Sequence, residues 1–207
     1  IYKGKTAHAA SCPEKGINAL NSVIQLFNGI DALRQHVTPD VKMHGIITKG
    51  GVAANIVPDE AVADFYFRAS TKERVTEVIE KVKKIAEGAA LMTGATLEME
   101  RYELPYDDLK TNEKLSEMFN ENLRALGITD INPGKATGGS SDIGNVSHVA
   151  PTIHPYIGIT DCPMVGHSVE MAKATTTNKA HDRLLIAALA MAYTGYDVIV
   201  RNESLRK

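Results

Sequence analysis

His8 is the first residue of the chain whose surroundings favour chemistry. It lies in Gly-Lys-Thr-Ala-His-Ala-Ala, residues 4–10, where small neighbours would let a ligand or another chain approach the imidazole closely. A histidine presented in this way can donate a hydrogen bond to a developing oxyanion. Taken alone, the same segment also fits a histidine exposed at the end of a strand.

Two more polar residues are candidates for binding a ligand. Asn55 lies in residues 50–59, a connection of ten residues, whereas hairpin loops usually have about 2–5. Its side-chain amide offers both a donor and an acceptor. Arg68 ends an alternating segment on its polar face and can bind a carboxylate through two parallel hydrogen bonds. The alternatives are an asparagine that stabilises its own loop and an arginine exposed to solvent.

The segment Gly138-Gly139-Ser140-Ser141-Asp142 predicts a turn that leads into a helix. Main-chain N–H groups at such a helix N-terminus can form an anion cradle. Ordinary capping of the helix by Ser or Asp explains the same residues. The pattern Gly-x-Ser-x-Gly of a nucleophile elbow does not occur, so a serine hydrolase is a distant alternative.

Three histidines, His148, His154 and His167, invite a metal hypothesis. His167 is expected after a strand and before a helix, where a ligand is easily presented. However, the chain contains no Cys-x-x-Cys, His-x-x-x-His or His-Glu-x-x-His pattern, and a catalytic zinc needs about three protein ligands. The local pattern therefore supports one isolated ligand, and His181, within a predicted helix, has a structural or solvent-facing role.

The first half of the chain predicts the elements that would position His8, Asn55 and Arg68. The hydrophobic periodicity and the turn residues give the order β-α-β-β-α-β. This order is typical of an α+β, ferredoxin-like fold, a four-stranded antiparallel sheet with both helices on one face. A free edge of that sheet invites pairing with a second copy. The predicted elements are strands at 2–10, 42–48, 61–68 and 96–104, and helices at 16–37 and from an N-cap at Ser70 or Thr71 to Thr93-Gly94.

Pro105 marks a boundary, so we expect one domain at residues 1–104 and another at 105–207. The second half predicts helices at 113–126 and 175–192 and a strand at 152–159. So few strands for these helices indicate part of an α/β domain whose other strands lie elsewhere. The apolar stretch 184–196 falls short of the roughly 20 residues of a membrane span and is interpreted as a core helix.

The composition excludes some classes of function. The formal net charge is −2 over 207 residues, and the pI is near 6.4. The chain therefore has no excess of positive charge that would favour binding to nucleic acid. Cys12 and Cys162 lie far apart, which favours a reducing cytosol over a disulfide. Ile1-Tyr2-Lys3-Gly4 carries no targeting pattern and has the character of a strand interior, so we expect the chain to begin within a fold.

Five segments, taken in their order, resemble the aminoacylase, carboxypeptidase G and dipeptidase family of metal-dependent amidohydrolases. The nearest branch is the p-aminobenzoyl-glutamate hydrolase type. The segments are Gly-Lys-Thr-Ala-His-Ala-Ala at 4–10, His-Gly-Ile-Ile-Thr-Lys-Gly-Gly with Ala-Asn-Ile-Val-Pro-Asp at 44–59, Phe-Arg-Ala at 67–69, Gly-Gly-Ser-Ser-Asp-Ile-Gly-Asn-Val-Ser at 138–147 and Gly-His-Ser-Val-Glu-Met-Ala at 166–172.

The resemblance implies a role for each candidate residue. Residues 1–104 match the lid, or dimerisation, domain, and residues 105–207 match the C-terminal portion of the catalytic domain. His8 matches a histidine that reaches into the partner subunit's active site and stabilises the oxyanion. The other matches are Asn55 near the substrate, Arg68 at its carboxylate, Gly139 and Ser140 near its C-terminal group, and His167 as the last metal-binding histidine.

The resemblance also implies a homodimer and a divalent metal. The metal would be zinc, with manganese or cobalt possible, and a complete active site would hold two ions. The N-terminal catalytic half, with the other ligands and the general base, does not precede Ile1. We therefore expect a fragment, inactive alone, of a hydrolase that cleaves N-acyl or N-aroyl amino acids or dipeptides by metal-activated water, without nucleic acid or membrane partners. The alternative is a non-catalytic module that dimerises or binds a small ligand.

Overall fold

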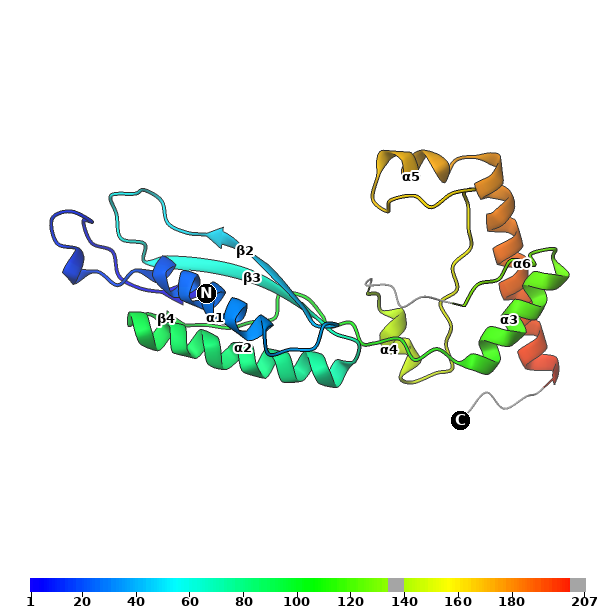
Figure 1. Cartoon of the computed structure of the whole chain (residues 1–207), viewed down its shortest axis with the longest axis horizontal. Helices are drawn as coiled ribbons and strands as arrows, with labels where there is room; N and C mark the ends of the chain where they lie inside the picture. The colour runs from blue at the N-terminus through cyan, green and yellow to red at the C-terminus, as the bar shows by residue number, and fades with distance from the viewer. Residues whose placement is uncertain (134–139, 202–207) are drawn as a thin grey trace. The chain divides into compact units, whose positions relative to one another are not determined.

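The computed structural model describes residues 1–133 and 140–201 of the chain. The chain forms two compact units, Ile1–Pro105 and Tyr106–Lys207, called unit 1 and unit 2 below. Figure 1 shows the elements of both.

Unit 1 contains a four-stranded sheet and two long helices. The strands follow the spatial order β2-β3-β1-β4, and every neighbouring pair is antiparallel. The predicted α+β fold with its β-α-β-β-α-β order is therefore confirmed. The elements are β1 (Tyr2–Lys3), the 3-10 helix η1 (Pro13–Lys15), α1 (Ala19–Arg34), β2 (Lys42–Lys49), β3 (Glu60–Arg68), α2 (Lys72–Thr93) and β4 (Thr96–Leu97).

One hydrophobic core lies between this sheet and its helices. Alternate residues of β3 contribute to it, as the period-two pattern predicted, and α1 and α2 contribute residues at three- and four-residue spacing. Because β3 residues of one parity pack with both helices, α1 and α2 cover the same face of the sheet (Figure 1). The members include Ala61, Ala63, Phe65 and Phe67 of β3, Val23, Leu26 and Ile30 of α1, and Val78, Val82 and Ala86 of α2.

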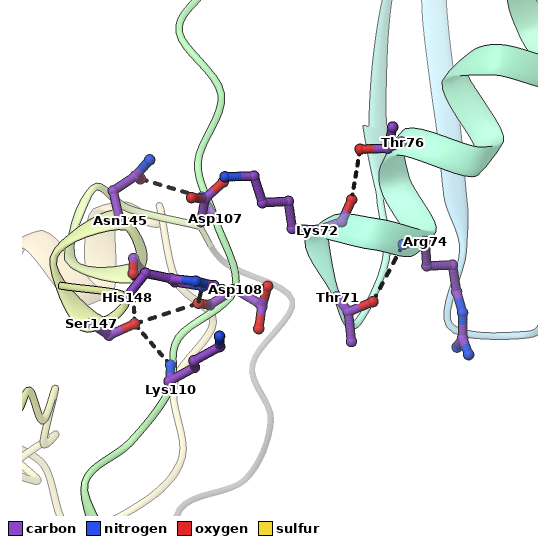
Figure 2. A network of polar contacts seen from close by, with 11 residues as sticks. Thr71, Lys72, Arg74, Thr76, Asp107, Asp108, Lys110, Asn145, Ser147 and His148 are labelled. Atoms are coloured by element: carbon purple, nitrogen blue, oxygen red, sulfur yellow. Dashed lines mark hydrogen bonds and ion pairs between the residues drawn. The ribbon is translucent and has the colours of Figure 1, made fainter. Parts of the chain in front are cut away.

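The ends of α2 follow from its capping residues. The Thr71 hydroxyl accepts a hydrogen bond from the Arg74 amide (Figure 2), so Thr71 rather than Ser70 is the N-cap. Gly94 takes the left-handed conformation, with φ at 78°, which ends a helix at little cost for glycine.

Strands β1 and β4 are shorter than predicted. β4 pairs only with β1, and the Glu98 amide bonds to the carbonyl of Ile1 at 2.9 Å. The expected strand at 96–104 stops at Leu97. After Lys3 the chain also leaves the sheet, which corrects the expected strand at 2–10.

Unit 2 is helical in the residues that the structure describes. Its elements are α3 (Glu113–Ala125), α4 (Ile143–Ser147), α5 (Val169–Ala174) and α6 (Asn178–Arg201). The predicted strand at 152–159 is wrong, because a strand needs a neighbour, and here Thr152 forms only an isolated bridge with Thr111. A small core of Phe119, Leu123 and Ala190 joins α3 to α6.

Helix α6 departs most from its prediction. It runs beyond residue 192 to Arg201, and only 11% of its most apolar 18-residue window is buried. The interpretation as a core helix is therefore wrong for the chain as described. Within the described residues, α6 is the one helix whose length and composition would suffice to cross a membrane.

Candidate functional site

The loop that carries His8 is closed at its base by two main-chain hydrogen bonds. Lys5 and Ile17 bond to each other reciprocally, with both N···O distances at 2.9 Å. Glycine permits this approach, because a Cβ on Gly4 would lie 2.1 Å from the Ile17 carbonyl oxygen. The segment between Lys5 and Ile17 is thus a loop with a fixed base.

The His8 ring has a defined tautomer. Its Nδ1 accepts hydrogen bonds from the amides of Ala10 and Ser11, both at 3.2 Å. A nitrogen that accepts two N–H groups carries no proton, so the neutral imidazole is protonated at Nε2. The side chain is exposed, which leaves Nε2–H as the donor that a ligand can meet.

Asn55 lies next to His8 because the two loops pair. The Ala9 amide donates to the Asn55 carbonyl at 3.0 Å, the Val57 amide donates to the Ala7 carbonyl at 2.9 Å, and His8 is bridged to Ile56. Asn55 is exposed and makes this contact through its main chain. The structure therefore brings His8 and Asn55 together at one end of unit 1.

An open hollow of about 470 Å³ lies beside the paired loops. Its lining is about equally polar and apolar and comes from Ala9, Asn18, Leu20 and residues 50–54 and 56–58. Gly51 has a φ of 119°, and a Cβ there would lie 2.9 Å from Pro58 Cγ. The shape of this wall therefore requires glycine at position 51.

Arg68 lies at the opposite end of β3 from the paired loops. The strand begins at Glu60, directly after Asp59, whose carbonyl accepts from the Gly4 amide at 2.7 Å. Eight further residues at a rise of about 3.4 Å each place Arg68 about 27 Å along the strand. Within one unit, Arg68 is thus not brought to His8.

Sequence reasoning missed an aromatic cluster on the open face of the sheet. His44 and Tyr66 are cross-strand neighbours with ring centroids 6.0 Å apart, and Tyr102 packs edge-on against Tyr66 at 5.7 Å. A hydrogen bond to the Glu103 carboxylate raises the pKa of Tyr66. The alternation of residues 61–68 could have indicated part of this cluster, because it places Tyr66 on the same polar face as Arg68.

Only part of the predicted Gly/Ser turn is described, since Gly138 and Gly139 lie outside the described residues. Ser140 is exposed. The Ser141 hydroxyl accepts from the Ile143 amide at 3.3 Å, whereas Asp142 makes no side-chain cap bond. The following helix α4 has five residues, so its dipole is small, and an anion cradle here would depend on the turn itself.

Polar side chains hold α4 against residues 107–110, an arrangement called the α4 clip below (Figure 2). The Asn145 side-chain oxygen accepts from the Asp107 amide at 3.3 Å. The Ser147 hydroxyl accepts from the Lys110 amide at 2.9 Å. No pattern in the sequence pointed to this pairing, because it joins segments nearly 40 residues apart.

The close approach of Gly144 and a hydrogen bond from His148 complete the α4 clip. A Cβ on Gly144 would lie 1.9 Å from the Asp107 carbonyl oxygen, so only glycine fits there. His148 Nε2 donates to the Asp108 carbonyl at 3.0 Å and lies 3.7 Å from its carboxylate. His148, one of the three histidines of the metal hypothesis, therefore has a structural role.

His167 adopts a left-handed backbone conformation, with φ at 58°. Such a conformation costs a non-glycine residue about 1 kcal/mol or more and persists only where neighbouring contacts hold it. Ser168 provides those contacts: its hydroxyl donates to the Val165 carbonyl at 2.8 Å and accepts from the Met171 amide at 3.1 Å, which caps α5. His167 is thus exposed at a helix start, although the expected preceding strand is absent from the described residues.

The described residues do not make a complete metal site. Residues 1–133 and 140–201 contain no group of three or more His, Cys, Asp or Glu side chains that could hold an ion. His154 instead packs against Tyr156, with ring centroids 5.1 Å apart. A catalytic divalent ion takes about three protein ligands, so the described residues do not hold such an ion by themselves.

Comparison with known proteins agrees with the geometry of unit 1. Residues 1–92 match the peptidase dimerisation domain of the M20 type. The Xaa-Arg dipeptidase of Homo sapiens is 35% identical over 207 residues, which cover 99% of this chain and 47% of that protein. A subunit of the p-aminobenzoyl-glutamate hydrolase of Escherichia coli is 26% identical over 265 residues, covering 100% of this chain and 54% of that protein.

A solved structure shows the same fold over most of the chain. Aminopeptidase PepT from Bacillus cereus aligns with a TM-score of 0.62 at 22% identity, covering 94% of this chain and 50% of that chain. This chain spans about half the length of the relatives that it matches. Unit 1 thus has the fold of a peptidase dimerisation domain. The chain is a relative of the M20 peptidases and amidohydrolases, which confirms the resemblance seen in its motifs.

Proposed function

We propose that the chain supplies the substrate-binding portion of a metal-dependent amidohydrolase. Its substrates would be N-acyl or N-aroyl amino acids or dipeptides, cleaved at the amide bond. The kinship with proteins named dipeptidase and p-aminobenzoyl-glutamate hydrolase supports this class. The observation that carries the proposal is the His8 ring, whose Nδ1 is occupied by two amides.

His8 would act as an electrophilic donor rather than as a base. With Nδ1 occupied, its Nε2–H can bond to the carbonyl oxygen of a scissile amide and bond more strongly as that oxygen gains charge. Loss of one such donor typically lowers kcat by about 10²–10³-fold. Asn55, exposed beside His8, would hold the same end of the substrate, and Arg68 and Ser140 would meet carboxylate groups.

A divalent ion would supply an activated water, but the described residues do not fit a complete site for it. M20-type peptidases in general depend on divalent metals, and we propose zinc, with manganese and cobalt as the alternatives. His167 would be one ligand. The remaining ligands, and the group that accepts the proton from water, would come from a polypeptide portion that this chain does not contain.

We further propose that the complete protein is a homodimer formed through β2. This strand pairs only with β3 and is an edge of the sheet. Unpaired main-chain groups on such an edge can pair with the same strand of a second copy. Lysine on an edge blocks this pairing, so Ile46→Lys with Ile47→Lys should convert a dimer to a monomer in sedimentation, whereas Thr96→Lys on the other edge should not.

The test of activity uses the chain alone and with its complement. The complement is defined as the part of the Homo sapiens Xaa-Arg dipeptidase that this chain does not match. We expect no turnover by the chain alone and metal-dependent turnover by a protein joining the two. In that protein, His8→Ala should lower kcat about 10²–10³-fold, whereas His36→Ala, an exposed histidine after α1, should leave it unchanged.

Turnover by the pure chain alone would contradict its assignment as an incomplete enzyme. Unchanged kcat in His8→Ala would remove the proposed role of His8. A cytoplasmic location is part of the proposal, because both Cys12 and Cys162 are free thiols, as a reducing compartment would keep them.

A further inference from the structure

The aromatic cluster of His44, Tyr66 and Tyr102 has no role in the site proposed so far. It lies on the open face of the sheet in unit 1, where neighbouring ring centroids are 6.0 and 5.7 Å apart. Tyr66 is 41% exposed and Tyr102 is 48% exposed. A ligand in solution can therefore reach both tyrosine rings.

Carboxylates lie beside these rings. The Tyr66 hydroxyl donates a hydrogen bond to the Glu103 carboxylate, and a second hydrogen bond joins Tyr66 to Tyr102. Asp64 precedes Tyr66 by two residues on β3, so it lies on the same face of the sheet. Aromatic rings attract cations to their faces, and carboxylates bind guanidinium and ammonium groups. The combination favours a positively charged ligand group.

Asp64, Tyr66 and Arg68 follow one another along this face of β3, in the order acidic, aromatic, basic. Alternate residues of a strand lie about 7 Å apart, and their side chains stand roughly perpendicular to the sheet. Lys42, the cross-strand partner of Arg68, donates to the Pro39 carbonyl at 2.8 Å, so its ammonium group is engaged there. The face thus places a basic group about 7 Å from rings and carboxylates.

A basic amino acid has the complementary arrangement of charges. The charge of a lysine or arginine side chain lies five bonds from its Cα, which is about 6 Å when the chain is extended. A substrate carboxylate bound to Arg68 would therefore leave this charge over the ring of Tyr66. A neutral side chain of the same length would gain neither the cation–π attraction nor the attraction of the carboxylates.

We infer that Tyr66, Tyr102 and Glu103 form a specificity site for a cationic side chain. The side chain belongs to the amino acid whose carboxylate Arg68 binds, so the preferred substrates are N-acyl derivatives of arginine or lysine and dipeptides that end in these residues. The inference rests on the proposed function for the role of Arg68, but binding to the rings is measured without turnover.

The test titrates the full chain with Nα-acetyl-L-arginine and follows the tyrosine rings by NMR. Nα-acetyl-L-citrulline is the matched ligand, because its urea group has the shape of a guanidinium group without the charge. We expect the Tyr66 and Tyr102 signals to shift, and the arginine ligand to bind at least about fivefold more tightly. Tyr66→Leu and Glu103→Gln should each lower this ratio to about twofold. Glu87→Gln, an exposed glutamate of α2, should leave the ratio unchanged.

Tyr66 and Glu103 are both exposed, so the melting temperatures of their variants should match that of the unsubstituted chain. Tyrosine signals that stay unchanged, or that shift equally with both ligands, would overturn the inference. A response to Nα-benzoylglycine alone would show a site for an aroyl group and would also overturn it.

The protein that joins the chain to its complement separates this inference from the proposed function. Its kcat/KM for N-acyl-arginine relative to N-acyl-citrulline should fall in Tyr66→Leu and Glu103→Gln. Turnover with no such change would count against the specificity site alone. Discrimination between the two ligands by the chain, without turnover by the joined protein, would count against the proposed function alone.

Discussion

The hydroxyl of Tyr2 donates a hydrogen bond to the main-chain carbonyl of Ala86 at 3.0 Å, inside the core of unit 1. This bond joins the first strand to α2 across 84 positions of sequence. In Tyr2→Phe the carbonyl loses its partner in a dry environment, so the free energy of unfolding should fall by about 1–3 kcal/mol. Urea unfolding followed by circular dichroism measures this, and Tyr156→Phe, an exposed tyrosine, should change little.

The same residue predicts a loss of stability in alkali. Burial raises the pKa of Tyr2 to about 12 from 10.0. Because the folded pKa lies above the unfolded one, its contribution is complete below pH 10 and is lost as the pH rises toward 12. The free energy of unfolding should therefore decline between pH 10 and 12, and less steeply in Tyr2→Phe. Equal slopes in both proteins would contradict the assignment.

Asp40 predicts a loss of stability in acid. It accepts from the Ser70 amide at 3.0 Å and from Arg74 at 2.9 Å. Hydrogen bonds from Thr38, Ser70 and Arg74 hold its pKa well below 3.8. Its contribution is therefore present above about pH 4 and is lost as the pH falls further. Asp40→Asn should lower the melting temperature at pH 7 and flatten its decline in acid, whereas Asp31→Asn should do neither.

The α4 clip makes Gly144 irreplaceable. A Cβ would lie 1.9 Å from the Asp107 carbonyl oxygen, so Gly144→Ala must push residues 107–110 away from α4. The Lys110 amide, bonded to Ser147, should then exchange its proton at least about tenfold faster. Gly158→Ala, where a Cβ meets nothing within 4 Å, should leave this rate unchanged. Equal protection in both variants would mean that the clip is not closed in solution.

The His8 tautomer can be observed in the chain alone. With histidine labelled by ¹⁵N, we expect the neutral His8 ring to carry its proton on Nε2. Ser11→Pro removes one of the two amide donors to Nδ1 and should increase the other tautomer. If His8 carried its proton mainly on Nδ1 in the unsubstituted chain, Nε2 would be an acceptor, and the oxyanion role would be lost.

Local sequence patterns predicted the order of the elements in unit 1 but not the short extent of β1 and β4. The alternation at residues 61–68, a cap at Ser70 or Thr71 and the helix end at Thr93-Gly94 are features of short segments, and each was visible in the sequence. The pairing of residues 7–9 with 55–57 was not, because it depends on contacts between two loops. For the same reason the position of Arg68 relative to His8 followed only from the structure.

Unit 2 was harder to predict because its segments pack against segments that are distant in the sequence. Residues 152–159 have a strand-like composition, but a strand forms only beside another strand, and Thr111 alone is paired with them. The composition of α6 indicated burial, and the structure leaves it exposed. The ordered motifs nevertheless predicted the similarity to M20-type peptidases and amidohydrolases correctly. The roles of Asn55, Arg68, Ser140 and His167 stay predictions.

The length of β3 limits what one copy of unit 1 can hold. An extended dipeptide is about 7 Å long, whereas Arg68 lies about 27 Å along the strand from the end that carries His8 and Asn55. In the proposed homodimer, a single small substrate that touches both His8 and Arg68 would therefore receive them from different subunits. When complete enzymes carrying His8→Ala and Arg68→Ala are mixed, each hybrid dimer would regain one intact site, and activity would return from two inactive parents.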